Sequence, residues 1–516
     1  MAYLGGPDDW PELADIPRMA RRLIHRAVLA ARADDAPVQR VLREHLGADA
    51  ASLPVVSGSW RGYDHVNVQA GLDAWLAGWR REHELVGITG FSRQNFGLAD
   101  LLQPAAEQMW LGVGSVAMAA LPCGPGGQTM ACVRCGLYLV DDGDTRLALL
   151  LRGPDDHDPD GNATLEVACA DQAAAQRVVD EVRQQAIARN VFRGQVISFG
   201  DEMFGHGRGS GGALRFHERP RLRRDMVVLP PAVLDDIERQ VIGVARHAGR
   251  LLASGQHLKR GVLLHGSPGT GKTHTIRYLL GQLDGVTVVI LSGQALRWIG
   301  EACSVARALA PSVVVIEDVD LIAEERGPRM GQHPLLFQLL NEMDGLGGDL
   351  DVTFLLTTNR PDLLEAALAA RPGRVDHAAE LPLPDAGGRR RLLELYRGSL
   401  VLDPPGPDEV ITRTEGVTAA FLKELLRRAA LLAAGAEPGR EGNGGAAPIR
   451  VTDAHLTEAL DQLLDARGQL TRTLLGWRGT AGQDAVIRPM GADAVIRRSE
   501  ALILQPRRKP STPQPT

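Results

Sequence analysis

The chain has 516 residues, enough for roughly two to four domains that each bury a hydrophobic core. Hydrophobic residues make up 44% and charged residues 23%, and the formal net charge of −6 is small for this length. This balance is ordinary for a globular protein and argues against a surface dominated by nucleic-acid binding. No window has the ~20 apolar residues of a membrane span, and the first residues lack the basic start of a signal peptide. We therefore expect a cytoplasmic protein with no membrane partner.

Almost all basic side chains are arginine, which together with many Ala, Gly and Pro residues is typical of a GC-rich bacterial genome. The five cysteines are sparse and odd in number, so they do not indicate a disulfide framework. Cys132 and Cys135 form one CxxC pair, but a zinc site would want a second pair of ligands. We interpret both cysteines as buried structural residues.

Residues 1–204 are expected to form an α/β recognition region, in one or two subdomains. Its first hundred residues have the spacing of helices and loops, for example at 72–79. Short apolar runs broken by Gly, Pro and Asp then predict strands from about residue 115, followed by a helix over 172–189 and a strand over 191–198. The region contains no recognisable catalytic constellation. A Gly-rich and then charged stretch predicts a linker over 205–224.

Residues 225–384 alternate apolar strands with helices, which predicts a parallel sheet covered on both faces. Residues 385–466 are expected to form a helical subdomain, and 467–516 a C-terminal extension with a disordered tail. The four strands expected in the α/β part cover 262–265, 286–291, 313–316 and 352–357.

A glycine-rich loop between the first of these strands and a helix carries the most specific motif. Glycines allow successive backbone N–H groups to turn toward phosphate oxygens, next to the positive end of a helix. Lys272 would reach the β and γ phosphates of ATP, and the hydroxyl of Thr273 would bind Mg²⁺. His274 follows just inside the helix and is counted with the nucleotide-binding residues, although packing would explain it as well. The loop fits GxxxxGK[ST] over Gly266, Ser267, Pro268, Gly269, Thr270, Gly271, Lys272 and Thr273.

A second element of this site is an apolar strand that ends in two acids. Residues 313–316 are followed by Glu317 and Asp318. An open α/β sheet places its ligands at the carboxyl ends of its strands, where these carboxylates would lie. One acid would orient the waters of Mg²⁺ and the other would polarise the attacking water. A surface acidic turn is the alternative interpretation.

The order and spacing of these motifs resemble the AAA subgroup of AAA+ ATPases, in an actinobacterial type, over roughly residues 225–464. The resemblance implies a P-loop NTPase fold with a helical lid, and hydrolysis of ATP with Mg²⁺. It places Asn359 at the family's sensor position, in contact with the γ-phosphate or its water. It makes Arg371 or Arg374 the arginine finger that acts on ATP in the neighbouring subunit. Which of the two arginines is the finger stays open, because the segment is one residue longer than is usual.

The resemblance also implies a ring, expected to be a homo-hexamer, that acts on a protein client through a central pore. Trp298, Ile299 and Gly300 are similar to the family's aromatic-aliphatic-Gly pore loop, whose side chains face the channel. Burial in a helix is the alternative for Trp298, although a glycine at position 300 weakens a helix.

One departure from the family concerns the two acids. The family usually has Asp-Glu where this chain has Glu317-Asp318, so Asp318 would stand about one methylene short of the water that it polarises. An ATP-binding scaffold with little hydrolysis is therefore one alternative function. A nucleic-acid remodelling ATPase is another and is not favoured, because DNA motors prefer basic pore loops. Direct proteolysis is set aside, since the sequence has no HExxH zinc motif.

Overall fold

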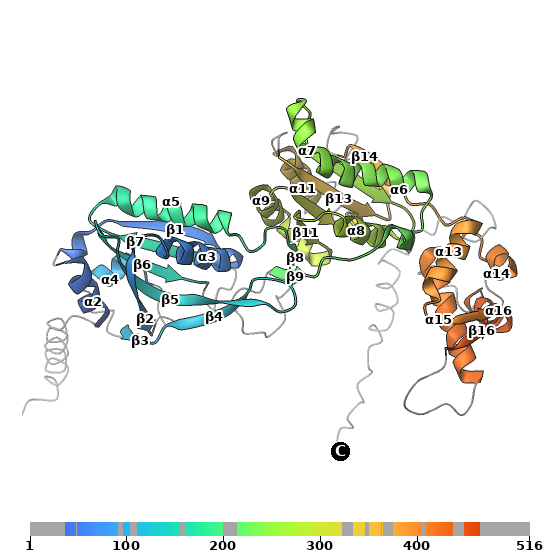
Figure 1. The fold of residues 1–516 in the computed structure, drawn as a ribbon, viewed down its shortest axis with the longest axis horizontal. Helices are drawn as coiled ribbons and strands as arrows, with labels where there is room; N and C mark the ends of the chain where they lie inside the picture. Colours follow the sequence, from blue (N-terminus) through green and yellow to red (C-terminus); the bar gives the residue numbers. More distant parts are fainter. Residues whose placement is uncertain are drawn as a thin grey trace, which may run out of the picture.

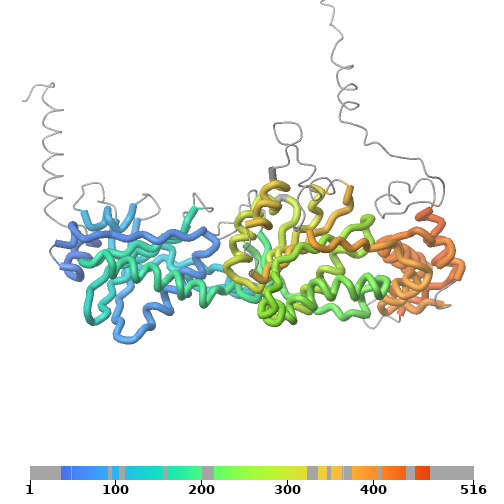
Figure 2. The backbone as a smooth tube through the Cα atoms, turned by 90° about the horizontal axis from the view of Figure 1, so that it is seen from above, coloured from blue at the N-terminus to red at the C-terminus, as the bar shows by residue number. Residues whose placement is uncertain are grey.

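The computed structural model describes residues 37–464, apart from residues 48, 91–95, 104–110, 155–160, 200–213, 322–333, 346–349, 363, 365–374, 404–407 and 437–447. Three parts follow one another along the long axis: an N-terminal α/β domain, a central α/β domain and a helical subdomain (Figures 1 and 2). The central part lies between the other two.

The N-terminal domain is built on an antiparallel sheet of seven strands, in the order β1-β7-β6-β5-β2-β3, with β4 paired to β5. The sequence predicted β4 to β7 within a few residues, because alternating apolar runs bounded by turns mark them. It missed β1 and β2, which lie in the part expected to be helix and loop. The strands are β1 (Val55–Arg61), β2 (Glu82–Thr89), β3 (Gly112–Gly114), β4 (Ala117–Pro122), β5 (Thr129–Asp141), β6 (Arg146–Arg152) and β7 (Asn162–Ala168).

Helices cover both faces of this sheet (Figure 1). α3 (His65–Leu76) and α5 (Gln172–Ala188) pack on one face, in a cluster with Leu149. α2 (Pro37–Leu46) and α4 (Leu98–Leu102) pack on the other, in a cluster with Leu150. Neighbouring residues of β6 thus enter opposite cores, as the two-residue period of a strand requires. Cys132 and Cys135 are buried, as expected, and form no disulfide.

The central domain has a second seven-stranded sheet, in the order β14-β10-β13-β12-β11-β8-β9. All neighbouring strands are parallel except β9, which runs antiparallel to β8. Helices on both sides bury the sheet, and the strands β12 and β13 are fully buried, as the sequence predicted for a parallel sheet. The strands are β8 (Val196–Phe199), β9 (Leu214–His217), β10 (Arg260–His265), β11 (Thr287–Leu291), β12 (Ser312–Ile316), β13 (Val352–Thr358) and β14 (His377–Glu380).

The expected boundary between the first two parts differs from the structure. The strand expected to close the N-terminal region is β8, and it pairs with β11 of the central sheet. β9 lies inside the expected linker 205–224, yet it is a strand of the same sheet. Arg219, expected in a solvated hinge, donates to the backbone oxygens of Gly194, Leu280 and Val286 at 2.7–2.9 Å. Composition could not reveal these pairing partners, because they are distant in sequence.

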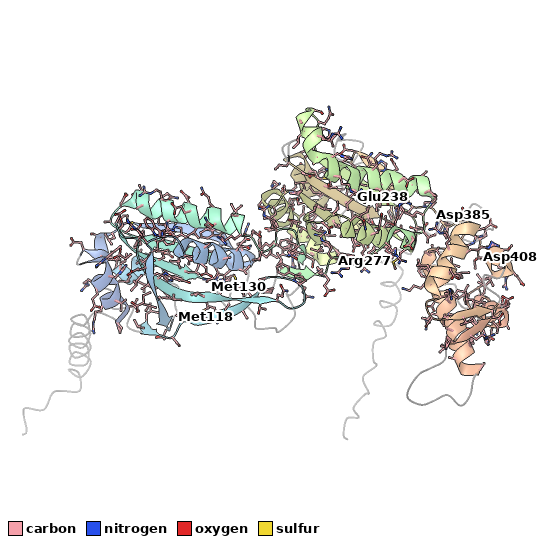
Figure 3. The ribbon with its side chains drawn as sticks, in the orientation of Figure 1. Met118, Met130, Glu238, Arg277, Asp385 and Asp408 are labelled. Atoms are coloured by element: carbon pink, nitrogen blue, oxygen red, sulfur yellow. The ribbon has the colours of Figure 1, made fainter. Side chains whose placement is uncertain are left out.

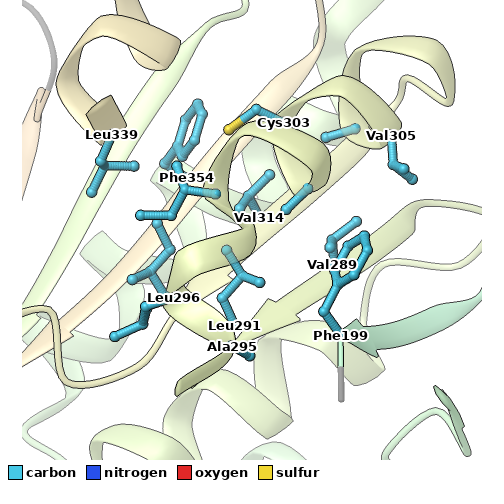
Figure 4. Close-up of a cluster of buried hydrophobic side chains, with 14 of the residues drawn as sticks. Phe199, Val289, Leu291, Ala295, Leu296, Cys303, Val305, Val314, Leu339 and Phe354 are labelled. Atoms are coloured by element: carbon cyan, nitrogen blue, oxygen red, sulfur yellow. The ribbon is translucent and has the colours of Figure 1, made fainter. Parts of the chain in front are cut away.

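The helices of the central domain form two apolar clusters, one on each side of the sheet. Residues of α9 and α11 contribute to one cluster, which also includes Phe199 and Val289 (Figure 4). α6 and α8 contribute to the other. These helices are α6 (Pro231–Glu238), α7 (Val244–Ala253), α8 (Lys272–Gly281), α9 (Ile299–Ala308) and α11 (Pro334–Asp344), and a π-helical turn η7 (Arg239–Gly243) joins α6 to α7.

The helical subdomain begins at Asp385, whose side chain accepts a hydrogen bond from the amide of Gly388 at 2.6 Å and so caps the first helix (Figure 3). Its helices enclose their own apolar cluster, so the expected lid over 385–466 is a helical unit through residue 464. No helix within the described ranges is long and apolar enough to span a membrane. The elements are α13 (Ala386–Tyr396), α14 (Asp408–Arg413), α15 (Ala419–Ala436) and α16 (Asp453–Leu464), with the paired strands β15 (Val401–Asp403) and β16 (Arg450–Thr452).

Candidate functional site

The glycine-rich loop lies between β10 and α8, in the strand–loop–helix context that the sequence predicted. Gly266, Gly269 and Gly271 have φ angles of +151°, +82° and +102°, which L residues with a Cβ rarely adopt. A Cβ at Gly266 would lie 2.6 Å from the backbone oxygen of Leu381, and one at Gly269 would lie 2.9 Å from the Cβ of Ala420. The loop therefore requires glycine for its backbone shape and for close approach of its neighbours.

Lys272 is the first residue of α8, and its relative exposure is only 7%. Its Nζ donates to the backbone oxygens of Gly266 at 2.8 Å and Ser267 at 3.2 Å, and to Oδ1 of Asn359 at 2.7 Å. Burial lowers the pKa of Lys272, while the carboxylates of Asp318 and Asp320 oppose that shift. The ammonium group is thus held in a partly desolvated position, where a phosphate would be a strong partner for it.

Asn359 follows β13 and bridges the lysine and an acid. Its Oδ1 accepts from Lys272, and its Nδ2 donates to Oδ1 of Asp318 at 3.2 Å. β10, β13 and β12 are neighbours in the sheet, so their carboxyl ends bring together Lys272, Asn359 and Asp318. The structure therefore joins three of the residues that the sequence selected from separate segments.

Asp318 has φ of +53°, one of two positive values among the described residues other than glycine. Aspartate tolerates this conformation better than most residues, and such strain occurs often at functional sites. The turn is fixed by the amide of Asp318, which donates to Oγ1 of Thr357 at 2.9 Å, and by the amide of Glu317, which donates to the backbone oxygen of Leu291 at 3.0 Å. Both carboxylates remain partly exposed, so they can meet a ligand.

The sequence interpretation missed a third carboxylate, Asp320, which is 8% exposed. Its Oδ1 accepts from Oγ1 of Thr358 at 2.9 Å and from the amide of Asn359 at 3.3 Å. Asp320 thus holds the backbone that carries Asn359, and it acts on the site through that residue. Its position two residues after Asp318 was the available signal, because an acid so close to a buried strand end needs partners.

Thr273 and His274 follow Lys272 in the first turn of α8. Thr273 is exposed, so its hydroxyl is accessible, whereas His274 is half-buried with Nε2 3.1 Å from the backbone oxygen of Met226. The amide of Ala420 donates to the backbone oxygen of Gly269 at 3.3 Å, which brings the start of α15 against the loop. The helical subdomain therefore contacts the phosphate loop directly.

The segment expected to face a pore is arranged differently. Ile299 is fully buried and starts α9, so the expectation that its side chain is exposed is wrong for this structure. Trp298 is half-buried and its ring stacks on Phe199, with centroids 6.0 Å apart. The glycine does not break the helix, because Gly300 lies in its first turn, where intrahelical hydrogen bonds are incomplete anyway. Arg371 and Arg374 lie outside the described residues, so their expected role stays a prediction.

The arrangement fits ATP with Mg²⁺ chemically. A loop that only glycines can form leaves room for phosphate oxygens, and Lys272 supplies a buried cation beside it. Magnesium is usually held by one or two carboxylates together with phosphates and water. Thr273, Glu317 and Asp318 offer such a partial set. Among the described residues, no group of three or more His, Cys, Asp and Glu side chains could hold a metal by itself.

Comparison with known proteins defines the class. Residues 262–383 match the model of the family "ATPase family associated with various cellular activities (AAA)". That range contains the glycine-rich loop, the two acids that follow β12 and Asn359. The match and the similar relatives support the interpretation of this part of the chain as an ATPase domain of the AAA type, with the P-loop NTPase fold that the sequence predicted.

Several curated proteins are similar over the same part. The chain is 36% identical over 210 residues to "ATP-dependent zinc metalloprotease FtsH 3" of Synechocystis, which covers 38% of this chain and 34% of that protein. It is 34% identical over 252 residues to "ATP-dependent zinc metalloprotease FtsH 2" of Symbiobacterium thermophilum, covering 45% and 41%. It is 36% identical over 211 residues to the human "ATPase family gene 2 protein homolog A", covering 38% and 23%. The chain thus spans about a third of the length of the first relatives.

Proposed function

We propose that this protein hydrolyses ATP with Mg²⁺ and uses the energy to remodel, unfold or translocate protein clients. The observation that carries the proposal is the convergence of Lys272, Asn359 and Asp318 at the carboxyl edge of the central sheet. In this arrangement, Lys272 would neutralise charge on phosphate oxygens, and Asp318 would accept a proton from the attacking water. Asn359 would keep these two side chains in register.

We further propose that the working form is a homo-hexameric ring. The sequence places Arg371 and Arg374 in the family's finger segment, where an arginine acts on ATP bound by the next subunit. Such an arginine stabilises charge that develops during phosphoryl transfer, so turnover would require neighbouring subunits. The cytoplasm remains the proposed location.

The N-terminal domain is the proposed site of client recognition. It is a complete α/β unit with two cores, joined to the ATPase sheet through β8 and β9. Two of the relatives named above are described as ATP-dependent metalloproteases, which supports a protein rather than a nucleic acid as client. Their similarity covers the ATPase part, so we propose remodelling activity for this chain and no proteolysis of its own.

The proposal is tested by ATP turnover of the purified chain, alone and with either an unfolded protein or DNA added. We expect turnover by wild type that an unfolded protein stimulates, and none by the Lys272→Ala variant. Stimulation by DNA alone would replace the protein client with a nucleic acid. ATP binding without turnover at every protein concentration would leave a nucleotide-dependent scaffold instead.

A further inference from the structure

The N-terminal domain and the ATPase sheet share an apolar core. β8 follows directly from the N-terminal domain and pairs in parallel with β11, with Val196 opposite Val288 and Ser198 opposite Ile290. One apolar cluster contains Val66 of α3 and Leu121 of β4 together with residues of β11, β12 and α9. A displacement of the N-terminal domain would therefore act on the edge of the ATPase sheet.

Phe199, the last residue of β8, lies at the centre of an aromatic stack. Its ring stacks on Trp298 with centroids 6.0 Å apart and an interplanar angle of 19°. Tyr63 of the N-terminal domain contacts the same Phe199 ring edge-on, with the two ring centroids 5.5 Å apart and an interplanar angle of 86°. Figure 4 shows Phe199 next to Val289 of β11, so the stack extends from the sheet. Tyr63 of the N-terminal domain thus packs against the ring on which Trp298 stacks.

The indole N–H of Trp298 lacks a hydrogen bond in this position, within the described part of the chain. Its Nε1 is buried and has no hydrogen-bond acceptor among the residues that the structure describes. A buried donor without an acceptor opposes the favourable contact of the rings, since in water the same group would be hydrogen-bonded. In the stacked position, the ring contact with Phe199 stabilises Trp298, whereas the unpaired Nε1 destabilises it.

The segment that carries Trp298 is also tied to the nucleotide site. It begins directly after Leu291, the last residue of β11, whose backbone oxygen accepts from the amide of Glu317 at 3.0 Å. The next residue, Asp318, bonds Asn359. At the far side of Trp298, Glu301 of α9 lies 3.7 Å from the guanidinium of Arg61 in the N-terminal domain. The segment that carries Trp298 thus lies between the strand end that bonds Glu317 and a helix that contacts the N-terminal domain.

We propose that the N-terminal domain is an intramolecular clamp in which Tyr63 holds Phe199 against Trp298, and that release of this clamp couples the domain to ATP turnover. In the clamped state, the segment between β11 and α9 is restrained. In the released state, Trp298 leaves the stack, its Nε1 finds an acceptor or water, and the end of β11 is free to follow the nucleotide site. The coupling to turnover rests on the proposed ATPase function, but the clamp itself does not.

The test is the accessibility of Trp298 to a fluorescence quencher such as acrylamide. The chain has seven tryptophans, so the signal of Trp298 is obtained as the difference between each protein and its Trp298→Phe counterpart. Phe199→Ala should raise quenching of Trp298 about twofold or more, because loss of the ring shifts the population toward the released state. Basal ATP turnover should rise roughly fivefold, the low end of allosteric coupling.

Two control variants separate the clamp from general damage. Phe199→Tyr keeps the stacking ring and should resemble wild type. Phe216→Ala removes a ring from the neighbouring strand β9 that packs on Phe192, and it should leave quenching of Trp298 unchanged. Unchanged quenching in a folded Phe199→Ala protein would overturn the clamp. Raised quenching with unchanged turnover would overturn the coupling, whereas absence of turnover in wild type would refute the ATPase proposal and leave the quenching result valid.

Discussion

The two seven-stranded sheets of this protein use their polar residues in opposite ways. In the parallel central sheet, the carboxyl ends of β10, β12 and β13 meet at one edge, where Asn359 bonds both Lys272 and Asp318 and the side chain of Asp318 remains partly exposed. On the antiparallel N-terminal sheet, Gln69 of the covering helix α3 donates to Asp73 of the same helix and to Tyr138 of β5, and it accepts from the amide of Val133 of β5. That network is closed on itself, so it stabilises the fold. Strand direction thus decides which polar groups can become a site.

The largest effect is expected for a substitution at the nucleotide site of the central sheet. Lys272→Ala removes the buried cation of the loop, so turnover should fall at least about a hundredfold, as when a single preorganised charge donor is deleted. Steady-state ATP hydrolysis measures the effect. Lys423→Ala is the matched control, because Lys423 is exposed on α15 and contacts only the face of Tyr396 among the contacts described. Equal loss in both variants would show that the effect is not specific to the site.

Asp318→Asn should produce the next largest effect. Asparagine tolerates the positive φ of this position and can still accept from Asn359, but it cannot take a proton from water. We expect turnover to fall by about 10²–10⁴ while ATP binding is retained, the range for loss of a general base. Hydrolysis and nucleotide binding are measured on the same preparation.

The control for this variant is Asp362→Asn, which changes an exposed acid paired with Arg360 at 3.0 Å. It should keep wild-type turnover. Wild-type turnover in Asp318→Asn would contradict the role of Asp318 and transfer the function to Glu317.

Asp320 is a buried acid that supports the nucleotide site through Asn359 rather than by facing it. Asp320→Ala leaves Oγ1 of Thr358 and the amide of Asn359 without their acceptor, at a cost of about 1–3 kcal/mol in the free energy of unfolding. The looser Asn359 should lower kcat roughly tenfold, with less change in KM. Asp320→Asn keeps an acceptor oxygen and should recover most of kcat. Equal loss of kcat in both variants would mean that the charge, not the hydrogen bonds, is required.

The smallest effect belongs to the N-terminal domain. Asp64 lies at a cavity of about 110 Å³ between this domain and α9, and burial raises the pKa of its carboxyl to about 6 despite a hydrogen bond from Asn67. The folded state therefore binds the proton more tightly than the unfolded state. The stabilisation is present below the unfolded value near 4 and is lost as pH rises through 6.

Asp64→Asn should accordingly stabilise the protein by about 1–2 kcal/mol more at pH 8 than at pH 4, relative to wild type. Chemical unfolding at several pH values measures this difference. Asp180→Asn, at an exposed position of α5, is the control and should show no such trend. A difference between Asp64→Asn and wild type that does not vary with pH would contradict the raised pKa.

The sequence predicted the nucleotide-site segments of the central domain better than the strand pairing between the domains, for a physical reason. The glycine-rich loop, the acids after β12 and Asn359 are local signals, because each sits at a strand end that apolar residues mark. β8 and β9 could not be assigned to the ATPase sheet, since their pairing with β11 depends on contacts distant in sequence. Burial of Ile299 was missed because it depends on packing against α11 and the N-terminal domain, which a three-residue pattern does not encode.

The central claim is that this chain is a ring-forming ATPase, and its most direct test is ATP turnover per subunit at increasing protein concentration. If an arginine of one subunit acts on the ATP of the next, turnover per subunit should rise steeply with concentration as rings assemble and then reach a plateau. Sedimentation at the same concentrations reports the assembly. Turnover per subunit that stays constant from monomer to oligomer, or that is absent throughout while ATP binds, would contradict the account.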